Sequence, residues 1–118
     1  MPFDERLAER LRVKLAGRDD VTEKRMFGSQ AFLVGGHLAC AASGRDGLLV
    51  RVAPEAADEA LDQPHAEPFV MRGRPVEGWI MVRQDGFASD ADLGAWVERS
   101  LAFVGALPPK APKASRAR

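Results

Sequence analysis

Few residues of this sequence have the types and spacing that catalysis or metal binding requires. Neither His37 nor His65 has a partner at metal-ligand spacing, and we expect His37 to be a solvated turn residue. No pattern fixes two carboxylates at the distance that acid–base catalysis needs; those considered are Glu23, Asp46, Glu55, Asp58 and Glu59. The sequence contains no Ser-His-Asp arrangement, phosphate-binding loop or dinucleotide fingerprint. It therefore predicts no catalytic residue, no metal and no cofactor.

The single cysteine, Cys40, has two interpretations. A thiol in this position can be reactive, or it can be a small hydrophobic residue of the core. Cys40 alternates with Leu38 and Ala42 in an apolar run, so we expect all three side chains to face inward. This pattern favours the core. One cysteine allows no internal disulfide, which fits a reducing cytoplasm.

Five residues are candidates for binding a partner or ligand: Arg25, Phe27, Arg72, Arg74 and Trp79. Either Arg25 and Phe27 contact a partner, or Arg25 lies at a strand edge while Met26 or Phe27 fills the core. Arg72 and Arg74 lie in an expected exposed loop, where they either hold an anionic group or are simply solvated. Trp79 marks an interface if it is exposed beside Phe69 or Phe87, and is a core residue otherwise.

The charge is balanced overall but not along the chain. The sequence has 17 Lys and Arg against 17 Asp and Glu over 118 residues. Residues 108–118 carry four cations and no acid, which leaves 13 cations against 17 acids, a net charge of −4, in residues 1–107. We expect 108–118 to be a disordered, solubilising tail, with weak contact to nucleic acid as the alternative. The acidic body argues against a duplex-binding face. No apolar run approaches the ~18 residues of a membrane span, so we expect a cytoplasmic protein.

Helical periodicity occurs near both ends of the chain. Apolar residues recur every fourth position from Phe3 to Leu15, which predicts an amphipathic helix of about four turns. Ser89 and Asp92 have the spacing of a helix N-terminal capping box, and an apolar stripe continues from there to Val104. Both stripes are one-sided. We therefore expect both helices to pack on the same face of a sheet.

Strand signals fill most of the sequence between these helices. Apolar alternation predicts strands at 22–27, 31–34, 37–42, 48–52 and 76–83. Gly35-Gly36 predicts a two-residue hairpin turn, and 54–61 a short helix. Residues 65–68 resemble a loop, and 69–71 only a short apolar run. The prediction is an α+β fold in two layers, with a mostly antiparallel sheet of four to five strands, formed by residues 1–107 as one domain.

Several segments, in order and spacing, resemble the N-terminal domain of the TfoX/Sxy family. They are Arg25-Met26-Phe27-Gly28, Phe32, Gly36, Leu48–Val52, Pro68-Phe69 and Gly73–Val76. The sequence departs from the family pattern at Ser29, where a second glycine is usual, and at Leu38, where an aromatic residue is usual. The resemblance does not extend to the C-terminal helical domain of full-length competence regulators.

This resemblance implies a fold similar to that of secretion chaperones, often able to pair, and an association with transcription regulation in bacterial competence. It carries no catalytic residues to this chain. We therefore expect a non-enzymatic regulatory or protein-interaction module, which binds a protein partner or forms a homodimer. The alternative is a pocket protein or enzyme that binds a small anionic ligand through Arg25, Arg72 or Arg74.

Overall fold

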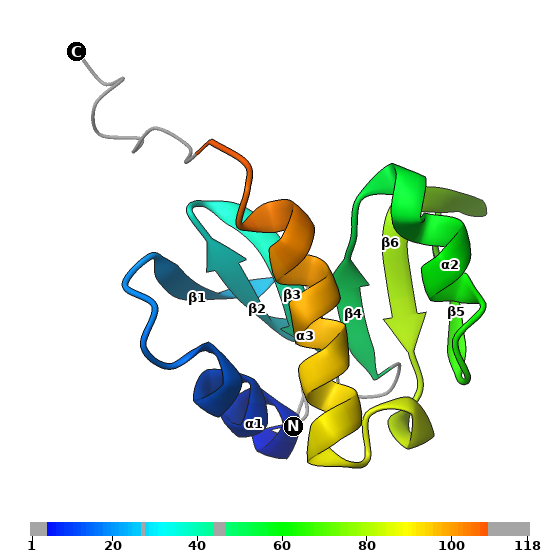
Figure 1. The fold of residues 1–118 in the computed structure, drawn as a ribbon. Coiled ribbons are helices and arrows are strands. Elements are labelled where there is room, and N and C mark those ends of the chain that lie inside the picture. The colour runs from blue at the N-terminus through cyan, green and yellow to red at the C-terminus, as the bar shows by residue number, and fades with distance from the viewer. Residues whose placement is uncertain (1–4, 27, 44–46, 109–118) are drawn as a thin grey trace.

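The computed structural model describes residues 5–26, 28–43 and 47–108, which form an antiparallel sheet and helices that pack on it (Figure 1). The elements in chain order are α1 (Glu5–Leu15), β1 (Val21–Met26), β2 (Ser29–Val34), β3 (His37–Ala42), β4 (Leu48–Arg51), α2 (Ala57–Leu61), β5 (Ala66–Met71), β6 (Arg74–Val82) and α3 (Asp90–Val104), with single 3₁₀ turns at Pro54–Ala56 and Gln84–Gly86. The strands are ordered β1-β2-β3-β4-β6-β5, and every neighbouring pair is antiparallel.

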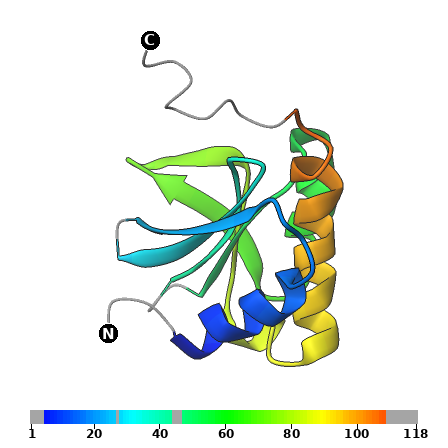
Figure 2. The same cartoon turned by 90° about the vertical axis from the view of Figure 1, so that its left-hand side faces the viewer.

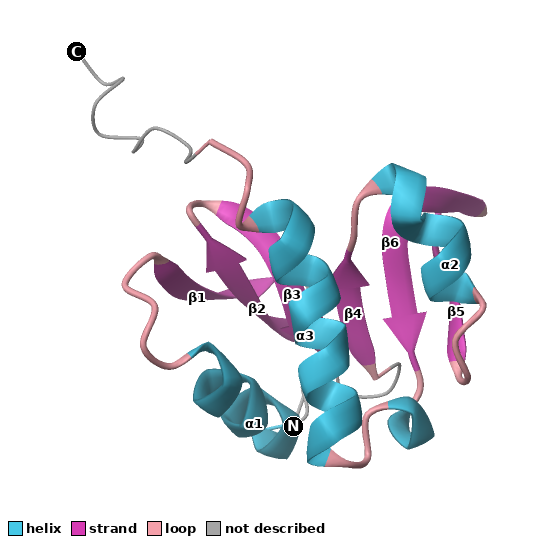
Figure 3. Cartoon of the chain, viewed as in Figure 1, coloured by secondary structure: helices cyan, strands magenta, loops and turns pink. Residues whose placement is uncertain are grey.

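All three helices lie on one face of the sheet, as the side view of Figure 2 and the colouring of Figure 3 make clear. The apolar stripes of α1 and α3 pack with alternate strand residues in one core, whose largest fully buried side chains include Phe32, Leu48 and Ile80. Each such side chain contributes about 1.5–3 kcal/mol of transfer free energy. The predicted α+β two-layer architecture is confirmed.

Two hairpins show how local residues fix the turns. Gly35 and Gly36 have φ of 60° and 87° and join β2 to β3, as the sequence predicts. Arg72 and Gly73, with φ of 55° and 78°, form the corresponding turn between β5 and β6. A positive φ is unfavourable for any residue with a Cβ, so the arginine is held there by the pairing of the two strands.

The sheet has six strands, one more than the upper limit that the sequence predicts. The additional strand is β5, which includes residues 66–68 that the sequence pattern assigns to a loop. Pro68 weakened the strand signal because it has no N–H to donate. It is tolerated here because β5 is an edge strand, and its pairing with β6 shifts register between Pro68 and Val70.

A bulge in β3 also changes one prediction. Phe32 lies opposite Cys40 but Leu33 lies opposite Leu38, so Ala39 is an extra residue in β3. Cys40 and Ala42 are buried in the core, whereas Leu38 lines a groove on the opposite face. The expectation that all three share one face is therefore wrong for Leu38. The buried hydroxyl of Ser100 on α3 donates to the Ala39 carbonyl at 2.8 Å.

The C-terminal helix begins as its sequence predicts. The Ser89 side chain accepts a hydrogen bond from the Asp92 N–H at 3.0 Å, and the helix ends at Gly105. The predicted tail lies outside the described residues except for Pro108, whose carbonyl oxygen is 2.7 Å from Nε2 of His37. The chain therefore returns to the β2–β3 hairpin after α3.

Candidate functional site

The sheet face away from the helices carries a row of apolar side chains. Ala31, Ala41, Leu49 and Met81 lie opposite one another across β2, β3, β4 and β6. None of the four belongs to the core beneath the helices. Because strand side chains alternate between faces, these residues point to the side that no helix covers.

The row forms the floor of a groove of about 400 Å³. Its walls are the β1–β2 hairpin and the β5–β6 hairpin, which extend on the side away from the helices in Figure 2. The described lining residues are Met26, Ser29, Ala31, Leu38, Ala41, Ser43, Leu49, Phe69, Met71, Trp79 and Met81. Among them the only polar side-chain groups are the two serine hydroxyls and the Trp79 indole N–H, and none ionises. The groove is thus suited to apolar side chains and has no group for acid–base chemistry.

Trp79 forms part of the groove wall and is only partly buried. Its ring centroid lies 6.4 Å from that of Phe69, a tilted aromatic pair. The guanidinium of Arg51 lies 5.5 Å from the Trp79 ring centroid and 5.3 Å from that of Phe103 on α3. The guanidinium of Arg51 therefore contacts both the Trp79 ring of the wall and the Phe103 ring of α3.

The three candidate arginines do not meet at one site. Arg25 lies opposite Gln30, whose amide binds Glu23 on the side of the sheet that faces α1. Arg74 lies opposite Met71, on the groove side, and Arg72 is in the turn beside it. β1 and β5 are the two edges of the sheet. The other candidate on the first hairpin, Phe27, lies outside the described residues.

Cys40 is a fully buried core residue beneath the helices. Burial raises the pKa of its thiol to about 12. Since the thiolate is the nucleophilic form, this cysteine is inert in the folded protein.

A second cavity, of about 240 Å³, is polar and lies on the helix side of the molecule. Its lining includes His65, Asp85, Asp92, Trp96 and Arg99. Arg99 lies 5.3 Å from the Trp96 ring centroid and pairs with Glu59 at 2.6 Å, which lowers the pKa of that carboxyl. Across residues 5–26, 28–43 and 47–108, no hydrogen bond joins the His65 ring to Asp85 or Asp92, and no cluster of three His, Cys, Asp or Glu could hold a metal ion. The cavity lacks an assembled catalytic pair.

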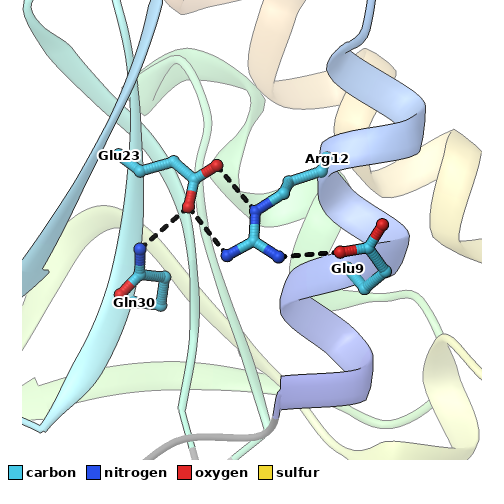
Figure 4. A network of polar contacts seen from close by, with 4 residues as sticks. All are labelled: Glu9, Arg12, Glu23 and Gln30. Atoms are coloured by element: carbon cyan, nitrogen blue, oxygen red, sulfur yellow. Dashed lines mark hydrogen bonds and ion pairs between the residues drawn. The ribbon is translucent and has the colours of Figure 1, made fainter.

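Another polar cluster is structural (Figure 4). Arg12 on α1 donates to both carboxylate oxygens of Glu23, at 2.7 and 2.9 Å, and to Glu9 at 2.8 Å. Gln30 donates to Glu23 at 2.9 Å. The hydrogen bonds from Arg12 hold the pKa of the Glu23 carboxyl below its usual range, and those from Arg12 to the two carboxylates raise the guanidinium pKa. The network joins α1 to the β1–β2 hairpin.

Sequence reasoning placed Trp79 among the candidates but missed the groove. A signal was present, because Leu49, Trp79 and Met81 are apolar at strand positions that alternate with the core residues. A strand that is apolar on both faces indicates that both faces contact something. The residues of the groove, however, come from two hairpins that are far apart along the chain.

No helix in the described part of the chain is long and apolar enough to cross a membrane.

Comparison with known proteins gives one match. Searches among curated proteins and among solved structures find no match. A family model described as the TfoX N-terminal domain matches residues 14–104 of the 118. Since this match covers most of the chain and agrees with the α+β fold, the chain belongs to the TfoX N-terminal domain family.

Proposed function

We propose that this protein is a non-enzymatic interaction module of regulatory type, and that it binds a protein partner in the apolar groove. The observation that carries the proposal is the groove itself. Its floor and walls are apolar, it is open on the side opposite the helices, and it contains an aromatic pair. A concave apolar pocket of this kind is the default hypothesis for a binding site on a small domain, and aromatic residues contribute strongly to interfaces.

Several features favour binding over catalysis. The described lining of the groove has no ionisable side chain, and the Cys40 thiol is buried and protonated. The polar cavity has its arginine already engaged by Glu59. These features leave the described residues with a surface for recognition and no assembled group for proton transfer or nucleophilic attack.

Family membership supports the regulatory part of the proposal. The family is associated with transcription regulation in competence, so the partner we propose is a protein of a regulatory complex in the cytoplasm. DNA itself is a less suitable ligand for this face, because nucleic-acid sites are polar and strongly cationic throughout whereas this groove is apolar.

Site-specific photocrosslinking in the source cell tests this function. A photoreactive phenylalanine analogue replaces Leu49, on the groove floor, or Val13, which is 67% exposed on α1. We expect the Leu49 position to give a discrete adduct with one protein, and the Val13 position to give none. The captured protein is then purified and titrated against the unmodified chain, and saturable binding is required.

The control for folding is the far-ultraviolet circular dichroism of both labelled proteins, which should match the unmodified chain. Equal adducts from both positions, or a captured protein that does not bind when purified, would contradict the proposal.

Thermal-shift screening with phosphorylated and carboxylated metabolites tests the alternative of a small anionic ligand. A saturable rise in melting temperature that is lost in Arg74→Gln would favour that alternative.

A further inference from the structure

Cations border the apolar groove on both of its walls. Lys24 lies directly opposite Ala31 in the β1–β2 pair, so it shares the groove face and is exposed at its rim. Arg74 lies opposite Met71 in the β5–β6 pair and is also exposed. Residues opposite each other in an antiparallel pair lie on the same face. Arg72 is in the turn between Met71 and Arg74.

A further cation lies at the aromatic wall. Arg51, opposite Trp79 in the β4–β6 pair, is partly exposed with its guanidinium over the Trp79 ring. Its described contacts are the two aromatic rings, and no salt bridge to it is formed within the described residues. A guanidinium that stacks on rings keeps its N–H groups available for a carboxylate.

Acids are fewer on the same strands. Glu67, opposite Met81, is paired with Arg83 at 3.0 Å, and Glu77 on β6 is exposed. Glu23, on β1, faces α1 and pairs with Arg12. Among the described residues, the border thus has five cations, Lys24, Arg51, Arg72, Arg74 and the Glu67-paired Arg83, against two acids, Glu67 and Glu77. Residues 1–107 as a whole have 13 cations against 17 acids. A positive rim around an apolar groove therefore stands out from an acidic body.

We propose that the segment that fills this groove is an acidic, amphipathic stretch of a partner protein, in which apolar side chains alternate with Asp or Glu. The inference rests on the function proposed above. The apolar side chains would enter the groove, and the carboxylates would pair with the rim. Lys24 and Arg74 lie on hairpins at opposite edges of the sheet, so a single carboxylate cannot serve both. Several carboxylates along one peptide can.

The same charges argue against a second copy of this chain as the occupant. Two copies that met groove to groove would bring two positive rims together, and like charges in juxtaposition oppose association. The acidic partner also explains why the rim is positive although the body is not: long-range attraction speeds the encounter, and the apolar groove supplies the affinity.

Selection from a display library tests the inference. Random twelve-residue peptides are selected on the immobilised full chain and counter-selected on Leu49→Asp, which puts a charge on the groove floor. Far-ultraviolet circular dichroism checks that this variant is folded. We expect enriched peptides to combine apolar residues with Asp or Glu. An enriched peptide is then resynthesised with each acid changed to its amide, which keeps the shape and removes the charge.

Charge reversal at the rim provides matched variants. Lys24→Glu and Arg74→Glu lie on the two walls, and Arg6→Glu makes the same charge change at an exposed position of α1. We expect each rim variant to weaken binding by about three- to tenfold at low salt, and Arg6→Glu by less than about twofold. The amide peptide should bind more weakly to the wild type, and equally to the wild type and the rim variants.

The outcomes separate the two proposals. Peptides that bind in the groove without acids, and with equal affinity to the rim variants, would overturn this inference and leave the proposed function standing. If every selected peptide bound the wild type and folded Leu49→Asp equally well, both proposals would be overturned. If the wild type sediments as a dimer and Leu49→Asp as a monomer, a second copy is the occupant and the inference is overturned. Displacement of the peptides by a long-chain fatty acid would also overturn the inference.

Discussion

The two faces of the sheet are built by the same alternation of strand residues but differ in what covers them. Leu48 and Leu49 are neighbours on β4, yet Leu48 is completely buried beneath the helices and Leu49 lines the open groove. The helix side forms one continuous core, while the groove side ends in a concave apolar surface between two hairpins. The chain itself covers the helix side completely, whereas on the groove side Leu49 stays partly exposed beside the buried Ala31, Ala41 and Met81. The function proposed above assigns this remaining apolar surface to a partner.

The largest expected change in stability is that of Leu48→Ala, which is compared with the same substitution at Leu49 on the other face. Leu48→Ala should lower the free energy of unfolding by about 2–5 kcal/mol, because it opens a cavity in a fully buried core. Leu49→Ala, one residue away, should cost less than about half as much, since its side chain already contacts solvent. Urea titration followed by circular dichroism measures both. Equal losses would show that the groove face is as much a core as the helix face.

Thiol reactivity sharpens the same comparison. Cys40 is buried and its pKa is raised to about 12, so it should react with a disulfide reagent only when the protein opens. A Leu49→Cys variant in a Cys40→Ala background should react at least about a hundredfold faster at pH 8, because its thiol lies in the partly exposed groove and not in the closed core.

Absorbance of the released thiolate gives both rates under native conditions. The Cys40→Ala protein without the new cysteine is the blank. Similar rates for the two thiols would mean that the helices do not protect their face of the sheet.

Ser100 tests how the covering helix is held to the sheet. Its hydroxyl donates to the carbonyl of the bulge residue Ala39, and both are buried. Ser100→Ala should cost about 1–3 kcal/mol, the range for a buried polar group left without its partner. Ser29→Ala, which removes a hydroxyl from the groove wall, should cost less than about 0.5 kcal/mol. If Ser100→Ala were as mild as Ser29→Ala, the bulge would not depend on α3.

The smallest effect concerns the ion pair between α1 and β1. The Glu23 pKa is lowered in the folded state by hydrogen bonds from Arg12. Its contribution to stability is therefore present above the unfolded pKa of about 4.3 and is lost as the pH falls through the folded pKa. Arg12→Met should cost up to about 1 kcal/mol at pH 7, and this difference from the wild type should shrink below about pH 4.

Stability measured from pH 7 to pH 3 checks this sign. The pKa values of Asp20 and Glu59 are also lowered, by Arg18 and Arg99, but these pairs are the same in both proteins and cancel in the difference. A difference that grew toward acid would contradict the assignment to Glu23.

Much of this fold could be predicted because its signals are local. Gly35-Gly36 specifies its turn through positive φ, and Ser89 caps α3 through a bond three residues away. Pro68 concealed β5, since only the position of that strand at the sheet edge makes a proline acceptable. The Ala39 bulge could not be predicted from alternation, and it reversed the side to which Leu38 points.

The candidate site was harder to predict than the fold because it depends on distant pairings. Trp79 carried a visible signal as an aromatic residue on a strand, and it does lie in the groove wall. Phe69, one of the two neighbours considered for it from the sequence, does lie beside it, whereas Arg51 comes from a strand that the sequence alone does not place there. Arg25 shared a motif with Phe27 but faces the other side of the sheet from Arg74.

The two tryptophans allow the most direct test of the central claim, because Trp79 lines the groove and Trp96 lines the polar cavity on the helix side. The measurement is the nitrogen–proton spectrum of the two indole groups during titration with a display-selected peptide, with Trp96→Phe used to assign the signals. The account predicts that the Trp79 resonance moves with saturation while the Trp96 resonance stays in place. Movement of Trp96 with an unchanged Trp79 would contradict it.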